Sequence, residues 1–309
     1  MRILVTGGAG FIGSHIVDAL VAAGHDVGVI DSLWEHGGGT RANLNPNAQF
    51  FLRDIRDPSL ADIFASFKPE LVSHHAAQHS VALSAKDPLY DADVNVRGLI
   101  NVVQRSVDSG VHKIIYASSA ATYGTPMYMP IDEAHPQRPE SPYGITKMVG
   151  EHYLRYFASA GGPAYTALRY GNVYGPRQDP SGEAGVIAIF ASRILAGKPI
   201  RIDWDGEQQK DYVYVGDIAR ANIAALTAAD GEAINIGNGI GTSVNQLHAA
   251  IAGAVGRDVA VQHAPKRAGD IRTCVFEIEK AKTVLRWEPA VSLRDGIAST
   301  IDFFRSKAN

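Results

Sequence analysis

The chain is poor in cysteine and has no long hydrophobic run. Its 309 residues include one cysteine, Cys274, so no internal disulfide can form and we expect a reducing compartment, the cytoplasm. A long apolar stretch, "GVIAIFASRILAG", contains Arg193 and is too short to span a bilayer. Glycines follow the start of "MRILVTGG" too closely for the apolar region of a signal peptide. The sequence therefore predicts no membrane segment.

Blocks of like charge are absent as well. The 29 basic and 32 acidic residues are scattered along the chain and leave a formal net charge of −3. Without a basic cluster we expect neither a nucleic-acid partner nor binding to a membrane surface. A hydrophobic content of 46%, with no internal repeat and no low-complexity tract, indicates a globular protein with a sizeable core.

The first half of the sequence alternates between short β-rich runs and helical patterns. The predicted strands are "RILVTG" (2–7), "DVGVID" (26–31), "LVSHHAA" (71–77) and "KIIYASS" (113–119), and the predicted helices cover 11–24 and 94–110. This alternation predicts an α/β fold, a Rossmann-type doubly wound parallel sheet with ligands at the carboxyl ends of its strands. We expect a dinucleotide-binding domain over residues 1–171. The less regular residues 172–309 predict a smaller substrate lobe, interleaved because about 213–238 return to the sheet.

A glycine-rich loop follows the first predicted strand. In "VTGGAGFIG", Gly8, Gly10 and Gly13 fit one dinucleotide spacing, and Gly7, Gly10 and Gly13 fit a wider one. Residues without a Cβ atom allow a tight turn and a close approach of the backbone to a pyrophosphate. The start of the following helix offers unpaired N–H groups to that anion. A purely structural glycine turn is the alternative.

An acidic residue stands where such a cofactor would need it. Asp31 ends the second predicted strand, 18 residues after Gly13. Its carboxylate can accept both hydroxyls of an adenosine ribose and would repel a 2′-phosphate, so NAD is favoured over NADP. Arg41 lies nearby in the sequence and would soften that exclusion.

The stretch "SPYGITK" (141–147) places Tyr143 four residues before Lys147, on one face of a helix. A phenol has a pKa near 10, and a neighbouring ammonium together with the positive ring of bound NAD would favour the phenolate. Ser118 and Ser119 end a predicted strand, where they could hydrogen-bond a substrate hydroxyl. Ser119, Tyr143 and Lys147 would then form a proton-transfer set. A solvated helix pair is the alternative.

These residues resemble the extended short-chain dehydrogenases, specifically the NAD-dependent epimerase/dehydratase family of nucleotide-sugar enzymes. The resemblance covers essentially the whole chain. It is carried by "TGGAGFIGSH", "HHAAQHSV", "DVNVRG", "ASSAATYG", "SPYGITK", "LRYGNVYGPRQ", "DGEQQKDYVYVGDIA", "INIGNG" and "RAGDIR". Within the family the chain is most similar to the UDP-hexose 4-epimerases.

The resemblance implies NAD as cofactor, a UDP-sugar as substrate and a homodimer formed through helices such as 98–109 and 146–158. Expected cofactor contacts are Gly7, Gly10, Phe11, Ile12, Gly13, Asp31, Asp54, Ile55, Ala76, Ala77, Gln78, Asn95, Ser118, Tyr143, Lys147 and Tyr170. Expected substrate contacts are Ser119, Tyr143, Asn172, Val186, Lys210, Arg267, Asp270 and Cys274.

Two alanines indicate the reaction. Dehydratases and decarboxylases of the family carry an acidic residue after the strand-end serine or threonine, where this chain has Ala120 and Ala121. Alanine cannot move a proton, so the resemblance implies 4-epimerisation through a 4-keto sugar, with Tyr143 as the base. Another NAD(P)-dependent nucleotide-sugar epimerase, for example one acting on UDP-glucuronate, a 4-reductase of the same fold and a catalytically idle NAD-sensing regulator are the alternatives.

Several positions depart from the family pattern. Gly171 replaces a phenylalanine, Lys210 replaces an arginine, and "DWDG" (203–206) replaces "YGDG". Cys274 stands where a tyrosine restricts the pocket to plain hexoses, so we expect room for an N-acetyl group, or else an ordinary buried cysteine. Asp179 would repel the carboxylate of a glucuronate. A metal site at His74, His75 and His79 is not expected, because they lack a carboxylate partner at ligand spacing.

Overall fold

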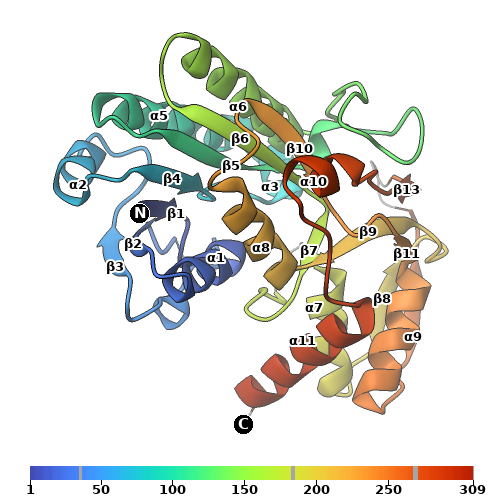
Figure 1. Cartoon of the computed structure of the whole chain (residues 1–309). Coiled ribbons are helices and arrows are strands. Elements are labelled where there is room, and N and C mark those ends of the chain that lie inside the picture. Colours follow the sequence, from blue (N-terminus) through green and yellow to red (C-terminus); the bar gives the residue numbers. More distant parts are fainter. Residues whose placement is uncertain (35–36, 182–184, 267–270, 309) are drawn as a thin grey trace.

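The computed structural model describes residues 1–34, 37–181, 185–266 and 271–308. Within them, a parallel sheet of seven strands forms the centre of the molecule, in the order β10-β6-β5-β4-β1-β2-β3 (Figure 1). The strands are β10 (Glu232–Ile236), β6 (Ala164–Tyr170), β5 (Lys113–Ser119), β4 (Leu71–His74), β1 (Arg2–Thr6), β2 (Asp26–Asp31) and β3 (Gln49–Leu52). The predicted Rossmann-type sheet is confirmed.

Helices cover both faces of this sheet. On one face lie α1 (Phe11–Ala22) and α8 (Val215–Ala225), and on the other lie α2 (Leu60–Phe67), α5 (Gly98–Asp108) and α6 (Pro142–Ser159) (Figure 1). Ile3, Leu4 and Val5 of β1 are all 0% exposed because the strand is covered on both sides. Near-continuous apolar runs of this kind are typical of parallel strands.

The strand order places the ligand crevice. The chain runs outward from β1 to β3 and then returns to β4 on the other side of β1. At such a reversal the connections leave in opposite directions and open a crevice at the carboxyl ends of the strands. The predicted strands β1, β2, β4 and β5 meet there, and β10 returns to the sheet from the second half of the sequence.

Short elements surround this edge. They are η1 (Arg41–Asn43), α3 (Val81–Lys86), α4 (Pro88–Ala92), η2 (Asp93–Arg97) and η3 (Ala120–Thr122). The segment predicted as one helix over 94–110 forms two elements, the π-helical turn η2 and the helix α5. Single π-helical turns inside helices are frequent at functional sites.

The second half of the chain adds a smaller group of elements. These are β7 (Asn172–Tyr174), α7 (Val186–Leu195), β8 (Ile200–Asp203), β9 (Gln209–Tyr214), β11 (Gly241–Ser243), α9 (Val244–Val255), β12 (Val261–Ala264), β13 (Thr273–Cys274), α10 (Glu279–Val284) and α11 (Leu293–Ala308). A separate core of α7, α9 and α11 residues holds this part together (Figure 1).

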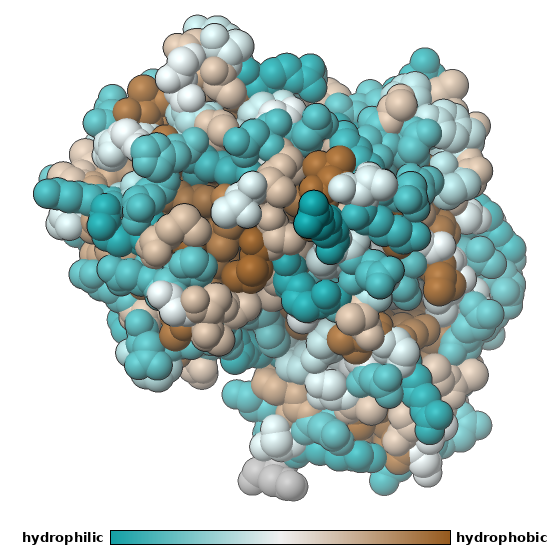
Figure 2. All heavy atoms as spheres, viewed as in Figure 1, coloured by the Kyte–Doolittle hydropathy of each residue, from teal (hydrophilic) through white to brown (hydrophobic). Residues whose placement is uncertain are grey.

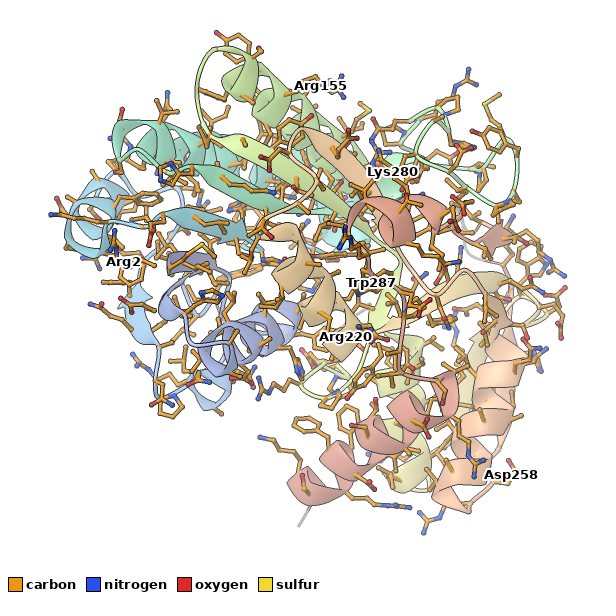
Figure 3. All side chains as sticks on the ribbon, viewed as in Figure 1. Arg2, Arg155, Arg220, Asp258, Lys280 and Trp287 are labelled. Atoms are coloured by element: carbon orange, nitrogen blue, oxygen red, sulfur yellow. The ribbon has the colours of Figure 1, made fainter. Side chains whose placement is uncertain are left out.

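The C-terminal segment is tied to the main sheet through α8. The indole nitrogen of Trp287 donates to the carbonyl of Asp217, 2.9 Å away, and Arg220 donates to the carbonyl of Glu288. Trp287 and Arg220 accordingly lie close together beside α8 in Figure 3, where Arg155 points outward from α6.

None of the described helices is long and apolar enough to cross a membrane. The face in Figure 2 is mostly hydrophilic, with hydrophobic residues in small, scattered groups.

Candidate active site

The glycine loop joins β1 to α1 in a conformation that larger residues would not permit. Gly7 has a φ of +72°, and a Cβ atom there would lie 2.6 Å from the backbone nitrogen of Ala76. A Cβ atom on Gly13 would lie 2.2 Å from the carbonyl oxygen of Gly7. Gly10 is the N-cap of α1 and makes no side-chain hydrogen bond, so no capping side chain occupies the start of the helix at Phe11 and Ile12. The cradle fits a pyrophosphate.

Asp31 lies against this loop at the end of β2. Its carboxylate accepts hydrogen bonds from the backbone N–H of Ala9, at 3.0 Å, and of Leu33, at 2.9 Å. Burial raises the pKa of this carboxyl, and the two backbone hydrogen bonds oppose that effect. The carboxylate is thus oriented by the loop itself. Arg41 instead stacks on the ring of Phe50, 5.5 Å from its centre.

Tyr143 and Lys147 lie in the first turns of α6. Ser141 caps the helix by accepting a hydrogen bond from the N–H of Gly144, and Pro142 occupies the first turn. The buried Lys147 ammonium donates to the carbonyl of Ala117, at 2.9 Å, and lies 5.8 Å from the centre of the Tyr143 ring. The predicted pair is therefore held against the end of β5.

The protein groups alone do not lower the pKa of the phenol. Burial raises the pKa of Tyr143 to about 12, and a hydrogen bond with Ser119 opposes this. Burial also lowers the pKa of Lys147 to about 8, whereas Asp91 raises it. The expected lowering of the phenol pKa combines the ammonium with the positive ring of bound NAD, and the protein groups supply only the first of these two charges. Further positive charge at the site is needed to favour the phenolate.

The two strand-end serines have different partners. Ser119 hydrogen-bonds with Tyr143 and accepts from the N–H of Ala121 at 3.2 Å. Ser118 is buried and donates to the carboxylate of Glu151 at 2.6 Å, and Glu151 forms an ion pair with Arg169 at 2.6 Å. Ser119 thus faces the tyrosine, while Ser118 links β5 to α6 and β6.

Gln78 and Asn95 bond to each other rather than extending toward open space. The N–H of Gln78 donates to the amide oxygen of Asn95 at 2.9 Å, and the Asn95 amide donates back to the carbonyl of Gln78. Both side chains also donate to the carboxylate of Asp91. These two predicted cofactor residues therefore shape the loop after β4, next to Ala76 and Ala77.

Two of the predicted cofactor contacts, Asp54 and Ile55, follow the end of β3. Asp54 accepts two side-chain hydrogen bonds from the guanidinium of Arg56, at 2.9 and 2.6 Å, and these bonds lower its pKa. Ile55 is 5% exposed and packs against Gly98, where a Cβ atom would lie 2.6 Å from its Cδ1. The charge of Asp54 is thus balanced by Arg56, and the side chain of Ile55 belongs to the hydrophobic core.

The histidines at the end of β4 are engaged in hydrogen bonds. His74 lies 2.8 Å from the hydroxyl of Thr6, and His75 lies 3.1 Å from the hydroxyl of Tyr170. Tyr170 also accepts from the amide of Asn222 at 2.8 Å. No group of three or more metal-binding side chains occurs within the described residues. Tyr170 is thus buried at the end of β6, with its hydroxyl bonded to His75 and Asn222.

The predicted substrate residues lie in the second half of the chain. Asn172 begins β7 and is exposed, and Val186 begins α7. Lys210 lies on β9, donates to the carbonyl of Ile271 at 3.0 Å, and is the ladder partner of Cys274 on β13. Cys274 is 8% exposed and packs with aromatic and aliphatic residues. Arg267 and Asp270 lie outside the described residues.

Sequence reasoning missed Asp91 and Thr146. Asp91 is 0% exposed and accepts a hydrogen bond from the hydroxyl of Thr146 at 2.8 Å, while Thr146 also donates to the carbonyl of Tyr143. An aspartate in "DPLYDADVNV" resembles an ordinary helix-surface residue, so only the position of Thr146 beside Lys147 could have pointed to it.

Comparisons with known proteins show the family of the chain. The model of the NAD dependent epimerase/dehydratase family matches residues 3–237. UDP-glucose 4-epimerase of Mycolicibacterium smegmatis is 43% identical over 315 residues and covers 100% of both chains. A crystal structure of UDP-glucose 4-epimerase from Thermotoga maritima with UDP-glucose is 46% identical, with a TM-score of 0.97 and 100% coverage of both chains. UDP-glucose 4-epimerase of Thermus thermophilus, in complex with NAD, is 43% identical, with a TM-score of 0.93 and 99% coverage of both chains. The chain belongs to the NAD-dependent epimerase/dehydratase family.

Proposed function

We propose that the protein is an NAD-dependent UDP-hexose 4-epimerase that interconverts UDP-glucose and UDP-galactose. One observation carries the assignment. Ser119, Tyr143 and Lys147 meet at the carboxyl end of β5, and the next residues are Ala120 and Ala121. The site thus has one proton acceptor, Tyr143. Positions 120 and 121 lack the acidic residue that a dehydration at C5 and C6 of the sugar would need. The full-length similarity to UDP-glucose 4-epimerases supports the same reaction.

The chain's own residues account for the proton transfer. Tyr143 takes the proton of the sugar 4-hydroxyl while the C4–H bond breaks and C4 becomes a carbonyl. Bound NAD supplies a reversible hydride acceptor, and its oxidised ring adds the positive charge that favours the phenolate. Ser119 hydrogen-bonds the same sugar hydroxyl, and Lys147 stays charged beside the phenol ring of Tyr143. The 4-keto sugar then presents its other face, takes back the hydride at C4 and regains the proton from Tyr143.

We infer that residues 172–309 hold the nucleotide sugar, apart from the segments that return to the main sheet. Lys210 would attract the diphosphate as a point charge, without the two-pronged geometry of an arginine. Because Cys274 is small, the pocket should also accept N-acetylhexosamines. Asp179 disfavours glucuronate by charge.

We also infer a homodimer formed through α5 and α6. Ile145 and Tyr156 on α6 are 45% and 64% exposed, and their spacing of 11 residues puts them on one helix face. Leu89 on the neighbouring α4 is 83% exposed. An exposed apolar face of this kind suits a second copy of the chain. Tyr156→Glu should convert a dimer into a species of 33.0 kDa in light scattering, and a wild type already of that mass would refute the dimer.

A cytoplasmic setting is inferred from the cysteine content alone, because Cys274 is free and buried.

The function is tested by incubating the purified protein with UDP-glucose, UDP-galactose and their N-acetyl forms, with no added NAD. Interconversion of at least the plain hexoses is expected, because the cofactor is regenerated in each cycle and stays bound. A stoichiometric requirement for added reduced cofactor would instead identify a 4-reductase. Turnover of none of the sugars, with NAD bound, would favour an NAD-sensing regulator.

A further inference from the structure

Asp91 is a buried carboxylate to which the proposed reaction gives no role. It lies on α4 and is 0% exposed, although a charged side chain in the interior is costly unless it is paired or hydrogen-bonded. Its Oδ1 accepts from the amides of Gln78, at 2.7 Å, and Asn95, at 3.1 Å, and its Oδ2 accepts from the hydroxyl of Thr146 at 2.8 Å. Both oxygens are therefore satisfied, each by groups from other segments.

Each partner of Asp91 belongs to a segment that forms the site. Gln78 lies in the loop after β4, Asn95 lies in the π-helical turn η2, and Thr146 lies on α6 between Tyr143 and Lys147. The carboxylate consequently joins three segments at one point. A shift of Thr146 would move the turn that carries the phenol and the ammonium.

Three titratable neighbours of Lys147 are uncharged, so the negative charge of Asp91 matters for the ammonium. His74 and His75 face the ammonium from β4 and its following loop, and the pKa of each is lowered to about 3 by burial, so both are neutral. Tyr116 faces it from β5, with Lys147 Nζ 5.1 Å from its ring centre, and burial raises the pKa of that phenol.

Two carboxylates also lie near Lys147 within the described part of the chain. Glu151 lies one turn further along α6, but its charge is balanced by the ion pair with Arg169. Burial raises the pKa of the Asp91 carboxyl, whereas its hydrogen bonds with Thr146 and Gln78 and the charge of Lys147 lower it. In return, the charge of Asp91 raises the pKa of Lys147. Asp91 therefore offsets part of the cost of burying the ammonium.

We propose that Asp91 is a positioning residue, whose buried negative charge keeps Lys147 protonated and whose hydrogen bonds fix the turn of α6 that carries Tyr143. Its kinetic consequence rests on the proposed function, whereas its effect on the charge of Lys147 concerns this chain alone. The two parts can be measured separately.

The charge is tested by Asp91→Asn, which keeps the shape and a hydrogen-bonding group but removes the negative charge. The Cε and Nζ signals of Lys147, assigned with Lys147→Met, are titrated by NMR in the full-length protein. The midpoint should fall by about 1 pH unit in the variant, since a partly buried charge pair contributes on that order. Asp217→Asn is the control, because Asp217 is a buried carboxylate on α8, away from Lys147. It should leave the midpoint unchanged.

The kinetic part is tested with the pH profile of kcat for epimerisation. In Asp91→Asn the alkaline limb should move to lower pH by the same amount, because Lys147 loses its proton earlier. Thr146→Val removes the hydrogen bonds of the hydroxyl with Asp91, Asn95 and the carbonyl of Tyr143 but keeps the carboxylate of Asp91, so kcat should fall at every pH with no shift of the limb. A lower kcat in Asp91→Asn without a shift of either titration would overturn the proposal.

Two results separate this proposal from the proposed function. If no sugar is turned over but the Lys147 midpoint still falls in Asp91→Asn, the counter-ion role stands and the epimerase assignment fails. If Asp91→Asn does not fold, the reciprocal measurement is made on Lys147→Met, where the midpoint of the Asp91 carboxyl should rise. An unchanged Asp91 midpoint in that variant would overturn the proposal.

Discussion

Lys147 and Tyr143 lie one helical turn apart on α6, with the ammonium nitrogen 5.8 Å from the centre of the phenol ring. The protein shifts their pKa values in opposite directions, the phenol to about 12 and the ammonium to about 8. Burial disfavours the charged form of both groups. A positively charged ligand ring bound beside Tyr143 would lower the pKa of the phenol and favour the phenolate.

Removing the phenol oxygen should abolish most of the activity. Tyr143→Phe should lower kcat by about 10²- to 10⁴-fold, the range for loss of a general base, while NAD stays bound. Tyr153→Phe, on the same helix, is the matched control and should retain activity. Steady-state kinetics with UDP-galactose measures both variants. Equal rates for Tyr143→Phe and wild type would refute the assigned base.

The buried His74 should make the stability of the folded protein sensitive to acid. Burial lowers the pKa of His74 to about 3, below its ordinary value of 6.5. As the pH drops from 6.5 toward 3, the unfolded chain binds a proton that the folded protein excludes, so the free energy of unfolding falls. For this one residue the loss between pH 7 and pH 5 is about 2 kcal/mol.

Urea denaturation at the two pH values measures this loss. In His74→Gln the pH-dependent part should shrink by about that amount, since glutamine has no proton to gain. His152→Gln, at an exposed position on α6, is the control and should behave as wild type. An identical pH dependence in His74→Gln and wild type would contradict the prediction.

Asp31 should set the choice of cofactor. Replacing it by serine removes the carboxylate that opposes a 2′-phosphate, so the preference for NAD over NADP should fall by about tenfold or more. Asp26→Ser, at the exposed start of the same strand, should leave the preference unchanged. Titration of both dinucleotides checks this, and an unaltered ratio in Asp31→Ser would count against the ribose role.

The glycine loop should tolerate no side chain at position 13. In Gly13→Ala the new Cβ would lie 2.2 Å from the Gly7 carbonyl oxygen, so the loop must shift and NAD affinity should fall at least about tenfold. Gly253→Ala is the control, because a Cβ there meets nothing within 4 Å. It should keep NAD affinity and raise the free energy of unfolding by about 0.5–1 kcal/mol. Undiminished NAD binding by Gly13→Ala would show that the loop is not the cradle.

A larger side chain at position 274 should reduce the set of UDP-sugars that the protein turns over. Cys274→Tyr should lose UDP-GlcNAc turnover and keep UDP-galactose turnover, because the larger ring would fill the space for an acetamido group. Cys274→Ala should keep both activities. Competition assays with the two sugars separate the cases. A parallel loss of both activities in Cys274→Tyr would mean that Cys274 serves only to pack against neighbours such as Tyr123 and Phe276.

The elements with strong local signals could be predicted from the sequence. The glycine loop, the strand that ends at Asp31 and the Tyr143–Lys147 spacing each combine a turn, a period and a chemical group within a few residues. The sequence does not predict β3 or β6. The run "QFFL" of β3 is too short to show a period, and β6 is fixed by its pairing with β5 and β10.

What the sequence could not supply is the three-dimensional surroundings of each group. Ser118 and Ser119 are adjacent and chemically identical, yet one bonds Glu151 and the other Tyr143, because successive residues of a strand point to opposite faces. The roles of Asp91 and Thr146 likewise depend on contacts between α4 and α6, 55 residues apart.

The most direct measurement is the fate of the hydrogen at C4. UDP-galactose labelled with deuterium at C4 is incubated with the purified protein in ordinary water, and the UDP-glucose formed is examined by NMR and mass spectrometry. Retention of the deuterium at C4 in essentially every product molecule is predicted, because the hydride leaves and returns within one closed site. Replacement of the label by solvent hydrogen would contradict the reaction proposed for Tyr143 and bound NAD.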